Sequence, residues 1–178
     1  DTITINQPDS LYSSNIISNY NGFNVSCFTG NDGEVNISVV GGTSPYFIYF
    51  NYSQYVGPNP TITGLNEGTY QDSIVDSNGC IYTESITLIE PPRLTSATLP
   101  INNADCYGLC NGSLAVLADG GVPPFNYIWN NDSTLISDTA DNLCAGTYIV
   151  IVEDQNGCQA SSLDSISQPN QISISLDS

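Results

Sequence analysis

The chain of 178 residues contains no histidine and no methionine, and its single basic residue is Arg93. Without histidine or lysine it lacks the usual general base near neutral pH, the amine of Schiff-base chemistry and the commonest metal ligand. A glycosidase can work with two carboxylates alone, but it needs the pair at a defined separation in a cleft. No carboxylate pair recurs at matching positions in the two halves of the sequence. We therefore predict that the protein is not an enzyme and has no catalytic residue, no metal ligand and no cofactor.

Positive charge is almost absent, because 18 acidic residues against one basic residue give a formal net charge of −17. Such a surface repels a phosphate backbone, so we expect no nucleic-acid partner. Apolar runs fall short of the roughly 18 to 20 residues that span a bilayer, and no polybasic stretch is present that would bind anionic lipid. The sequence therefore predicts a segment with no membrane span.

A thirteen-residue signature occurs twice, as GTYQDSIVDSNGC over Gly68–Cys80 and as GTYIVIVEDQNGC over Gly146–Cys158. Self-similarity at a fixed period is typical of repeat architectures, in which each copy forms a similar domain. The match continues upstream at an offset of 79 residues, where Cys27, Gly33, Gly41, Gly42, Pro45 and Tyr46 correspond to Cys106, Gly112, Gly120, Gly121, Pro124 and Phe125.

A recurring proline, at Pro8, Pro91 and Pro169, marks the boundaries of the repeats. With neither methionine nor a signal peptide, the chain is expected to be a slice of a longer mature polypeptide. The expected divisions are the tail strand of a preceding repeat (1–8), repeat 1 (9–91), repeat 2 (92–169) and the first strand of a following repeat (170–178).

Alternation of apolar and polar residues dominates, for example over 34–40, 46–52 and 113–118, whereas helical spacing is hard to find. This pattern predicts an all-β fold. Asn78-Gly79 and Asn156-Gly157 lie between strand-like runs and favour a type I′ hairpin, because Asn-Gly accepts positive φ angles. Gly-Gly pairs followed by proline mark an earlier turn in each repeat.

Aromatic residues narrow the fold further. Tyr70 and Tyr148 each follow a Leu-x-x-Gly-x pattern that is typical of a tyrosine corner, in which the hydroxyl bonds the backbone just upstream. Trp129, with Phe50 at the matching position, would fill the core from the third strand. We therefore predict tandem immunoglobulin-like Greek-key β-sandwich repeats, stapled by disulfides.

Six cysteines are typical of a protein in an oxidising exterior. Cys27 and Cys80 in repeat 1 are equivalent to Cys106 and Cys158 in repeat 2, which suggests one bridge per domain. We predict that Cys27 pairs with Cys80 and that Cys106 pairs with Cys158, each bridge stapling one end of its sandwich.

Cys110 and Cys144 have no counterpart in repeat 1, where Asn31 and Asn66 align with them. Both cysteines are absent together from repeat 1, as expected if the two form one disulfide, so we predict that Cys110 pairs with Cys144. A four-cysteine zinc site in repeat 2 is the alternative, but a Cys-x3-Cys spacing with no second close pair is a weak ligand pattern. Repeat 1 could not form such a site at all.

These motifs together resemble the SprB-repeat family, which occurs in very large cell-surface adhesins of Bacteroidetes that act in gliding motility and attachment. The resemblance rests on the cysteine before the second strand, the Gly-Gly-x-x-Pro-aromatic motif, the Gly-Thr-Tyr to Asn-Gly-Cys signature and the closing proline. In repeat 2, Cys110 and Cys144 resemble the four-cysteine form of the repeat. Phe50 in place of the usual tryptophan is a departure in repeat 1.

The resemblance implies secretion through the type IX system, display on the bacterial outer surface and a role as a spacer or adhesive repeat, with neighbouring repeats as partners. The same cell type implies O-glycosylation at short motifs that begin with Asp-Ser or Asp-Thr. The candidate acceptors are Thr2, Ser10, Ser73, Ser133, Thr139 and Ser165.

Two further hypotheses have weaker support in the sequence. Tyr52, Tyr55 and Tyr107 in predicted loops could belong to a carbohydrate-binding module, with surface glycans as partners. Calcium could stiffen the domain junctions of so acidic a protein. The Asp-x-Asn-Gly segments lack the spaced ligands of a calcium loop, however, and favour hairpin turns.

Overall fold

The computed structural model describes residues 3, 7–130 and 135–174, and its strands are joined by turns and loops. The chain divides into two compact units, unit 1 over Asp1–Pro91 and unit 2 over Pro92–Ser178. No helix occurs among the described residues. The prediction of an all-β fold is therefore confirmed.

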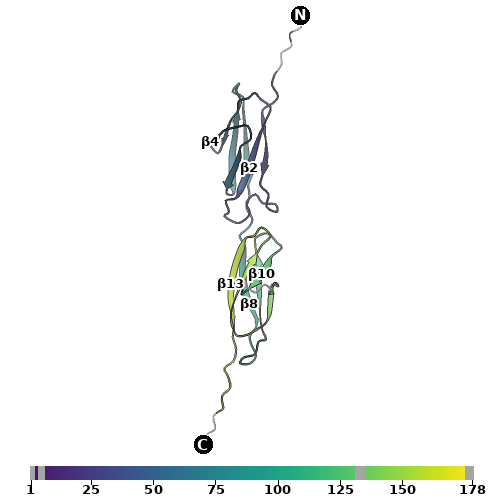
Figure 1. The fold of residues 1–178 in the computed structure, drawn as a ribbon, viewed down its shortest axis with the longest axis vertical. Helices are drawn as coiled ribbons and strands as arrows, with labels where there is room; N and C mark the ends of the chain where they lie inside the picture. The colour runs from purple at the N-terminus through teal and green to yellow at the C-terminus, as the bar shows by residue number, and fades with distance from the viewer. Residues whose placement is uncertain (1–2, 4–6, 131–134, 175–178) are drawn as a thin grey trace. The chain divides into compact units, whose positions relative to one another are not determined.

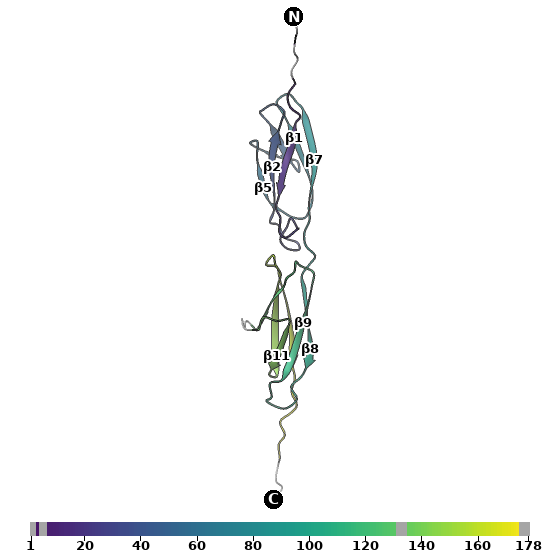
Figure 2. The ribbon, with the colours of Figure 1, turned by 90° about the vertical axis from the view of Figure 1, so that its right-hand side faces the viewer.

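Unit 1 is a sandwich of two antiparallel sheets; Figures 1 and 2 label its strands β1, β2, β4, β5 and β7. One sheet has the order β1-β2-β5, and the other has the order β4-β3-β6-β7. The strands are β1 (Tyr12–Ile17), β2 (Gly33–Val40), β3 (Phe47–Phe50), β4 (Ser53–Tyr55), β5 (Thr61–Leu65), β6 (Gly68–Val75) and β7 (Ile81–Leu88).

Unit 2 repeats this arrangement with the sheets β8-β9-β11 and β10-β12-β13 (Figure 1). Its pairings are again antiparallel, and β12 and β13 pair over their full length as β6 and β7 do. The strands are β8 (Thr95–Asn102), β9 (Gly112–Asp119), β10 (Asn126–Trp129), β11 (Thr139–Leu143), β12 (Gly146–Glu153) and β13 (Gln159–Ile166).

The core of each unit lies between its two sheets, where the inward side chains of alternating strands meet. Trp129 on β10 is fully buried, and Phe50 at the matching place on β3 is 2% exposed. The indole N–H of Trp129 donates to the carbonyl of Ser137 at 2.9 Å, so this large side chain is buried with its polar atom satisfied. The predicted core role of both aromatics on the third strand is confirmed.

The hairpin between the last two strands differs from the predicted type I′ turn. Among its residues only Gly79 has a positive φ in unit 1, and only Gly157 in unit 2, whereas type I′ requires two. The N–H of Gly79 donates to the carbonyl of Asp76 at 3.0 Å, which closes a turn of the ordinary type I kind before a left-handed glycine. Such three-residue connections fit the strand twist through the bulge that the glycine allows.

The Gly-Gly pairs form left-handed turns, as their sequence context predicts. Gly41 has a φ of 72° and Gly120 a φ of 74°. A Cβ atom on Gly41 would collide with the carbonyl of Ser10, and one on Gly120 with that of Arg93. Glycine is therefore required here both for the backbone conformation and for the close approach of the entering chain.

Only part of each expected terminal strand lies within the described residues. The tail strand expected over residues 1–8 falls mostly outside the described residues. At the other end, residues 170–174 are described and belong to no strand, and residues 175–178 lie outside the described part. The assignment of these ends to flanking repeats stays a prediction.

Candidate functional site

The aspartate of the repeated signature ties two turns together. In unit 2, Asp154 is 2% exposed, and its carboxylate accepts hydrogen bonds at 2.9 Å from the backbone N–H groups of Asn156 and Cys158. It also accepts one from the N–H of Val122 in the Gly-Gly turn, at 2.9 Å. In unit 1 the same three bonds reach Asp76 from the N–H groups of Asn78, Cys80 and Thr43. One buried carboxylate thus joins the two motifs that recur along the chain.

Hydrogen bonding sets the charge state of Asp76. Burial by itself raises the pKa of this carboxyl group, but the N–H groups of Cys80, Thr43 and Asn78 favour the ionised form and lower the pKa below its ordinary value of 3.8. Because the folded-state pKa is lowered, the stabilisation is complete above about pH 4 and is lost as the pH falls through that pKa. The hairpin of unit 1 therefore depends on an ionised Asp76.

Both predicted tyrosine corners have the expected hydrogen bond. The hydroxyl of Tyr70 donates to the carbonyl of Asn66 at 3.1 Å, and that of Tyr148 donates to the carbonyl of Cys144 at 3.0 Å. The ring of Tyr70 also stacks on Phe50, with 5.2 Å between the ring centroids. These tyrosines anchor the start of β6 and β12, which leaves their hydroxyls engaged in the fold.

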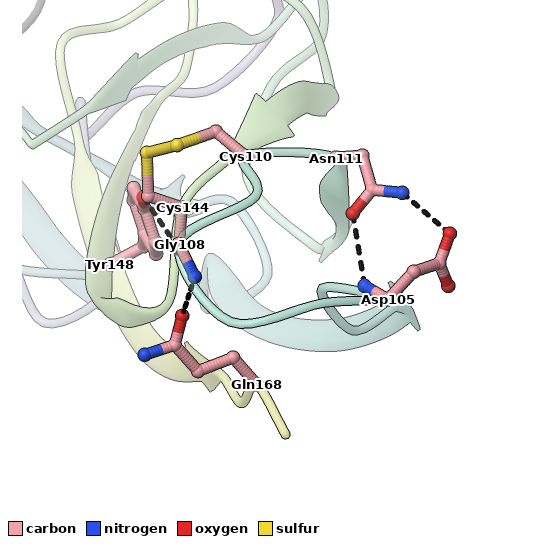
Figure 3. Close-up of a disulfide and its surroundings, with 7 residues drawn as sticks. All are labelled: Asp105, Gly108, Cys110, Asn111, Cys144, Tyr148 and Gln168. Atoms are coloured by element: carbon pink, nitrogen blue, oxygen red, sulfur yellow. Dashed lines mark hydrogen bonds between the residues drawn. A yellow bond between two sulfur atoms is a disulfide. The ribbon is translucent and has the colours of Figure 1, made fainter. Parts of the chain in front are cut away.

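A disulfide joins Cys110 and Cys144, the pair that the sequence predicts (Figure 3). It ties the loop before β9 to the turn before β12, beside the corner formed by Tyr148. In the same loop the N–H of Gly108 donates to the side-chain carbonyl of Gln168 at 2.8 Å. The loop is thus held both by the bridge and by the chain that leaves unit 2.

The other two predicted pairings, Cys27 with Cys80 and Cys106 with Cys158, are wrong. Cys80 and Cys106 carry free thiols at exposed positions, whereas Cys27 and Cys158 are disulfide-bonded. Neither predicted pair can therefore exist in this structure. The equivalence of the cysteines between the repeats is real, but it does not translate into one bridge within each repeat.

Strand length explains the failure of these pairings. In unit 1, Cys80 directly precedes β7, while the loop that contains Cys27 is attached beyond the other end of β7, where the N–H of Asn24 donates to the carbonyl of Ile89 at 2.8 Å. Eight residues of extended strand span roughly 25 Å, whereas the Cα atoms of a disulfide lie within about 7 Å of each other. In unit 2 the same holds across β13 for Cys158 and Cys106.

A buried acid distinguishes unit 1 from unit 2. Asp72 on β6 is fully buried, pairs across the sheet with Glu84 on β7, and has no hydrogen-bond partner on either carboxylate oxygen. The hydroxyl of Ser13, which could serve it, donates to Glu84 at 2.9 Å. Burial raises the pKa of Asp72, the Ser13 hydroxyl opposes this, and the charge of Glu84 raises the pKa further, so that it lies above the ordinary 3.8.

The Asp72–Glu84 pair does not form a catalytic dyad, because Asp72 is sealed in the core and no substrate can reach it. The equivalent residue in unit 2 is Val150, which is also fully buried and fits its surroundings without polar atoms. Asp72 is a site that the sequence reasoning missed. Its signal was a charged residue at an inward position of an alternating strand.

Replacing Asp72 by valine is expected to stabilise unit 1 by about 1–3 kcal/mol at neutral pH, the usual cost of a buried polar group left unpaired. The pKa of Asp72 is higher in the folded than in the unfolded state. The wild-type unit therefore loses stability as the pH rises from the unfolded-state pKa through the folded-state pKa, and the valine variant does not. Urea unfolding followed by circular dichroism at pH 4 and pH 7 measures this. Asp72→Asn is the control that removes the charge and keeps the polar group; a valine variant less stable than wild type at pH 7 contradicts the prediction.

The tyrosines proposed to contact carbohydrate differ in exposure and belong to two different units. Tyr52 is 91% exposed, and Tyr55 is half-buried against the core of unit 1. Tyr107 is 54% exposed and belongs to unit 2. An open groove of about 530 Å³ lies on the face of β10 and β12, but no aromatic side chain lines it; its residues are Ile128, Asn130, Thr147, Ile149 and Ile151. Glycan binding stays a prediction.

The candidate O-glycosylation sites fall in different environments. Ser10 and Ser165 are exposed, whereas Ser73 and Thr139 are half-buried. Thr2 and Ser133 lie outside the described residues. Only the first two of these sites thus present a hydroxyl on an exposed residue of the described chain, and their modification stays a prediction.

Within residues 3, 7–130 and 135–174, no three side chains of the acidic, cysteine or histidine kinds gather as a metal ion would require. Over the same residues no helix has the length and hydropathy needed to cross a bilayer.

The chain is similar in fold to several solved structures. The three N-terminal domains of the outer capsid protein Hoc of bacteriophage RB49 match with a TM-score of 0.50 at 14% identity, over 89% of this chain and 59% of that one. A C-terminal fragment of intimin, in complex with the intimin-binding domain of its receptor Tir, matches with a TM-score of 0.46 at 14% identity, over 93% and 65%. The eight N-terminal Ig domains of DSCAM match with a TM-score of 0.42 at 17% identity, over 90% and 25%.

The similarity to Hoc, at 14% identity, shows the fold alone. With the two antiparallel sheets of each unit, it agrees with the immunoglobulin-like sandwich that the sequence predicts, which is confirmed.

The sequence comparisons are more specific. No curated protein matches the sequence. The family model of the SprB repeat matches residues 23–52 and residues 98–134. Each of the two β-sandwich units therefore carries one segment that matches the SprB repeat family.

Proposed function

We propose that this chain is a structural and adhesive repeat segment of a large extracellular adhesin or filament, which acts in surface attachment or gliding motility. The observation that supports this role is that the duplicated residues serve the fold of their own unit. Asp76 and Asp154 join turns, and Tyr70 and Tyr148 anchor strands. What the repeat preserves is a building block, and its function comes from stacking several of them.

Composition supports an extracellular position for this segment. A net charge of −17 opposes non-specific aggregation, and the disulfide between Cys110 and Cys144 fits an oxidising environment. Secretion through the type IX system and display on the bacterial outer surface belong to the same proposal. Glycans on the exposed Ser10 and Ser165 would add to the polar surface.

Antibody fragments raised against the purified chain test the location. They are expected to label intact cells of the producing bacterium and to reduce its attachment or gliding. Labelling that requires permeabilised cells would refute the extracellular position.

Deletions in the parent gene test whether the repeats act as spacers. Removing residues 9–91 or residues 92–169 deletes one repeat of similar length in each case, so the two deletions serve as matched controls. A spacer role predicts that both reduce attachment by the same amount and that removal of both repeats reduces it further. A loss caused by only one of the deletions assigns a ligand site to that repeat, and attachment unchanged by all three would refute a role in adhesion.

A further inference from the structure

The two free thiols occupy ordered turns at the surface. The N–H of Cys80 donates to the side chain of Asp76 at 2.9 Å, which fixes this cysteine at the hairpin. The carbonyl of Cys106 accepts a bond from the N–H of Leu109 at 3.1 Å, which closes a turn in the loop before β9. Both side chains therefore project from defined positions on the fold.

In each unit the hairpin cysteine lies where the chain enters the sandwich. The N–H of Gly42 donates to the carbonyl of Asp9 at 2.9 Å, so the entering chain lies beside the Gly-Gly turn, which Asp76 joins to the hairpin. In unit 2 the N–H of Gly121 donates to the carbonyl of Pro92 at 2.8 Å in the same way. Cys80 and Cys158 are thus the entry-end cysteines.

The loop cysteine lies where the chain leaves the sandwich. In unit 2 the N–H of Ala104 donates to the carbonyl of Ser167 at 3.0 Å, just after β13, and Gln168 accepts the N–H of Gly108. In unit 1 the N–H of Thr29 donates to the side chain of Glu90 at 2.6 Å, just after β7. Cys27 and Cys106 are thus the exit-end cysteines.

Each type of cysteine has one bonded and one free member. The exit-end Cys27 and the entry-end Cys158 are disulfide-bonded, whereas Cys106 and Cys80 are free. Since the two cysteines of one unit lie a strand length apart, a free one can find a partner only outside its own unit. The bonded equivalents show that both positions are suited to disulfide formation.

We propose that Cys80 and Cys106 are coupling sites that bond covalently to further copies of this repeat, an entry-end cysteine always pairing with an exit-end cysteine. The proposal rests on the array function proposed above. In a chain of repeats with one direction, the exit end of each repeat is followed by the entry end of the next. Disulfides of this kind would make the array one continuous covalent fibre held at every junction that carries both cysteines.

The reaction is a thiol–disulfide exchange with a disulfide oxidant. The thiolate of Cys80 attacks the oxidant disulfide and releases one thiol, and the thiolate of Cys106 on the preceding copy then attacks the mixed disulfide and releases the second. The two cysteines lose two protons and two electrons in total, and the oxidant disulfide is reduced to two thiols. Pairing of unlike ends is a head-to-tail contact, so copies can add without limit and form an open chain.

Incubation of the purified chain with oxidised and reduced glutathione tests this. The wild type is expected to form a ladder of covalent multimers that a reductant collapses, and peptide mapping is expected to find Cys80 joined to Cys106. Cys80→Ser and Cys106→Ser alone are each expected to lose every species above the dimer. The double variant Cys80→Ser/Cys106→Ser keeps the other four cysteines and is the control: it should form no covalent multimer, and a ladder in this variant would overturn the proposal.

An equal mixture of the two single variants measures the pairing rule, because it offers one free entry-end and one free exit-end thiol. Random pairing would make half of the dimers heterodimers, so the proposal requires a larger fraction. A fraction of half or less, or the absence of covalent multimers, overturns it. If the ladder forms but the antibody finds the protein only inside the cell, the proposed array function is refuted and the coupling of the cysteines is supported. If the antibody labels the cell surface but no linkage between an entry-end and an exit-end cysteine forms, only the coupling is refuted.

Discussion

Asp154→Ala is expected to lower the free energy of unfolding of unit 2 by about 3–5 kcal/mol, because bonds from backbone N–H groups to an ionised acceptor contribute roughly 1.5–3 kcal/mol each and do not add fully. Three such bonds end on this carboxylate. Without this carboxylate, three backbone N–H groups in these two turns have no acceptor. A typical domain stability is about 5–15 kcal/mol, so a unit at the lower end of this range would become only marginally folded.

The single tryptophan makes the effect measurable in one unit. Trp129 is fully buried in unit 2, so its fluorescence during urea unfolding reports on that unit, and circular dichroism reports on both. Asp154→Asn is the control, since its amide oxygen can still accept the N–H groups of Asn156 and Cys158 but its NH2 group then faces the N–H of Val122. A smaller loss is expected for asparagine than for alanine. Equal losses, or an alanine variant as stable as the wild type, would show that the carboxylate does not hold the turns together.

Much of the fold could be predicted because it depends on local rules. The alternation of apolar residues identified the strands, and the bulk of Trp129 and Phe50 at the third strand placed them in the core. The hairpin turn was located correctly but given the wrong type, since an Asn-Gly pair permits two positive φ angles without requiring them. Here the backbone N–H of Asn78 donates to the side chain of Asp76, and the φ angle of Asn78 is not positive.

The cysteine pairing could not be predicted because it depends on which end of a strand each residue reaches. The repeat comparison correctly showed that Cys27 matches Cys106 and that Cys80 matches Cys158. It carried no information on the direction in which the chain crosses the sandwich between them. The structure shows this direction. Strand β7 begins next to Cys80 and ends beside the loop of Cys27, so a full strand length separates the two cysteines.

The Cys110–Cys144 bridge is expected to contribute about 3–4 kcal/mol to unit 2, because it closes a segment with a sequence separation of 34 in the unfolded chain. Cys110→Ser/Cys144→Ser should therefore move the midpoint of the Trp129 fluorescence transition to a lower urea concentration, by this free energy divided by the m-value of the transition. The transition of unit 1, seen by circular dichroism, should not move. A double variant with an unchanged tryptophan transition would show that the bridge adds no stability to the unit.

Unit 1 offers the reverse experiment, because a hydrogen bond takes the place of this bridge. The side-chain N–H of Asn66 donates to the carbonyl of Gly30 at 2.8 Å, and Asn31 and Asn66 align with the two bridged cysteines. The hydroxyl of Tyr70 donates to the carbonyl of Asn66 as that of Tyr148 donates to the carbonyl of Cys144, so the same corner forms in both units.

Asn31→Cys/Asn66→Cys is thus expected to form a bridge in unit 1. The bridge should raise the free energy of unfolding of this unit by about 3–4 kcal/mol, less about 1 kcal/mol for the lost hydrogen bond. The bridge is detected as a mass loss of two hydrogens on oxidation. Its effect on stability is measured as a shift of the urea transition of unit 1 that occurs only without reductant. A bridge that forms without this shift would contradict the prediction, because it would mean that the bridge does not restrict the unfolded loop further.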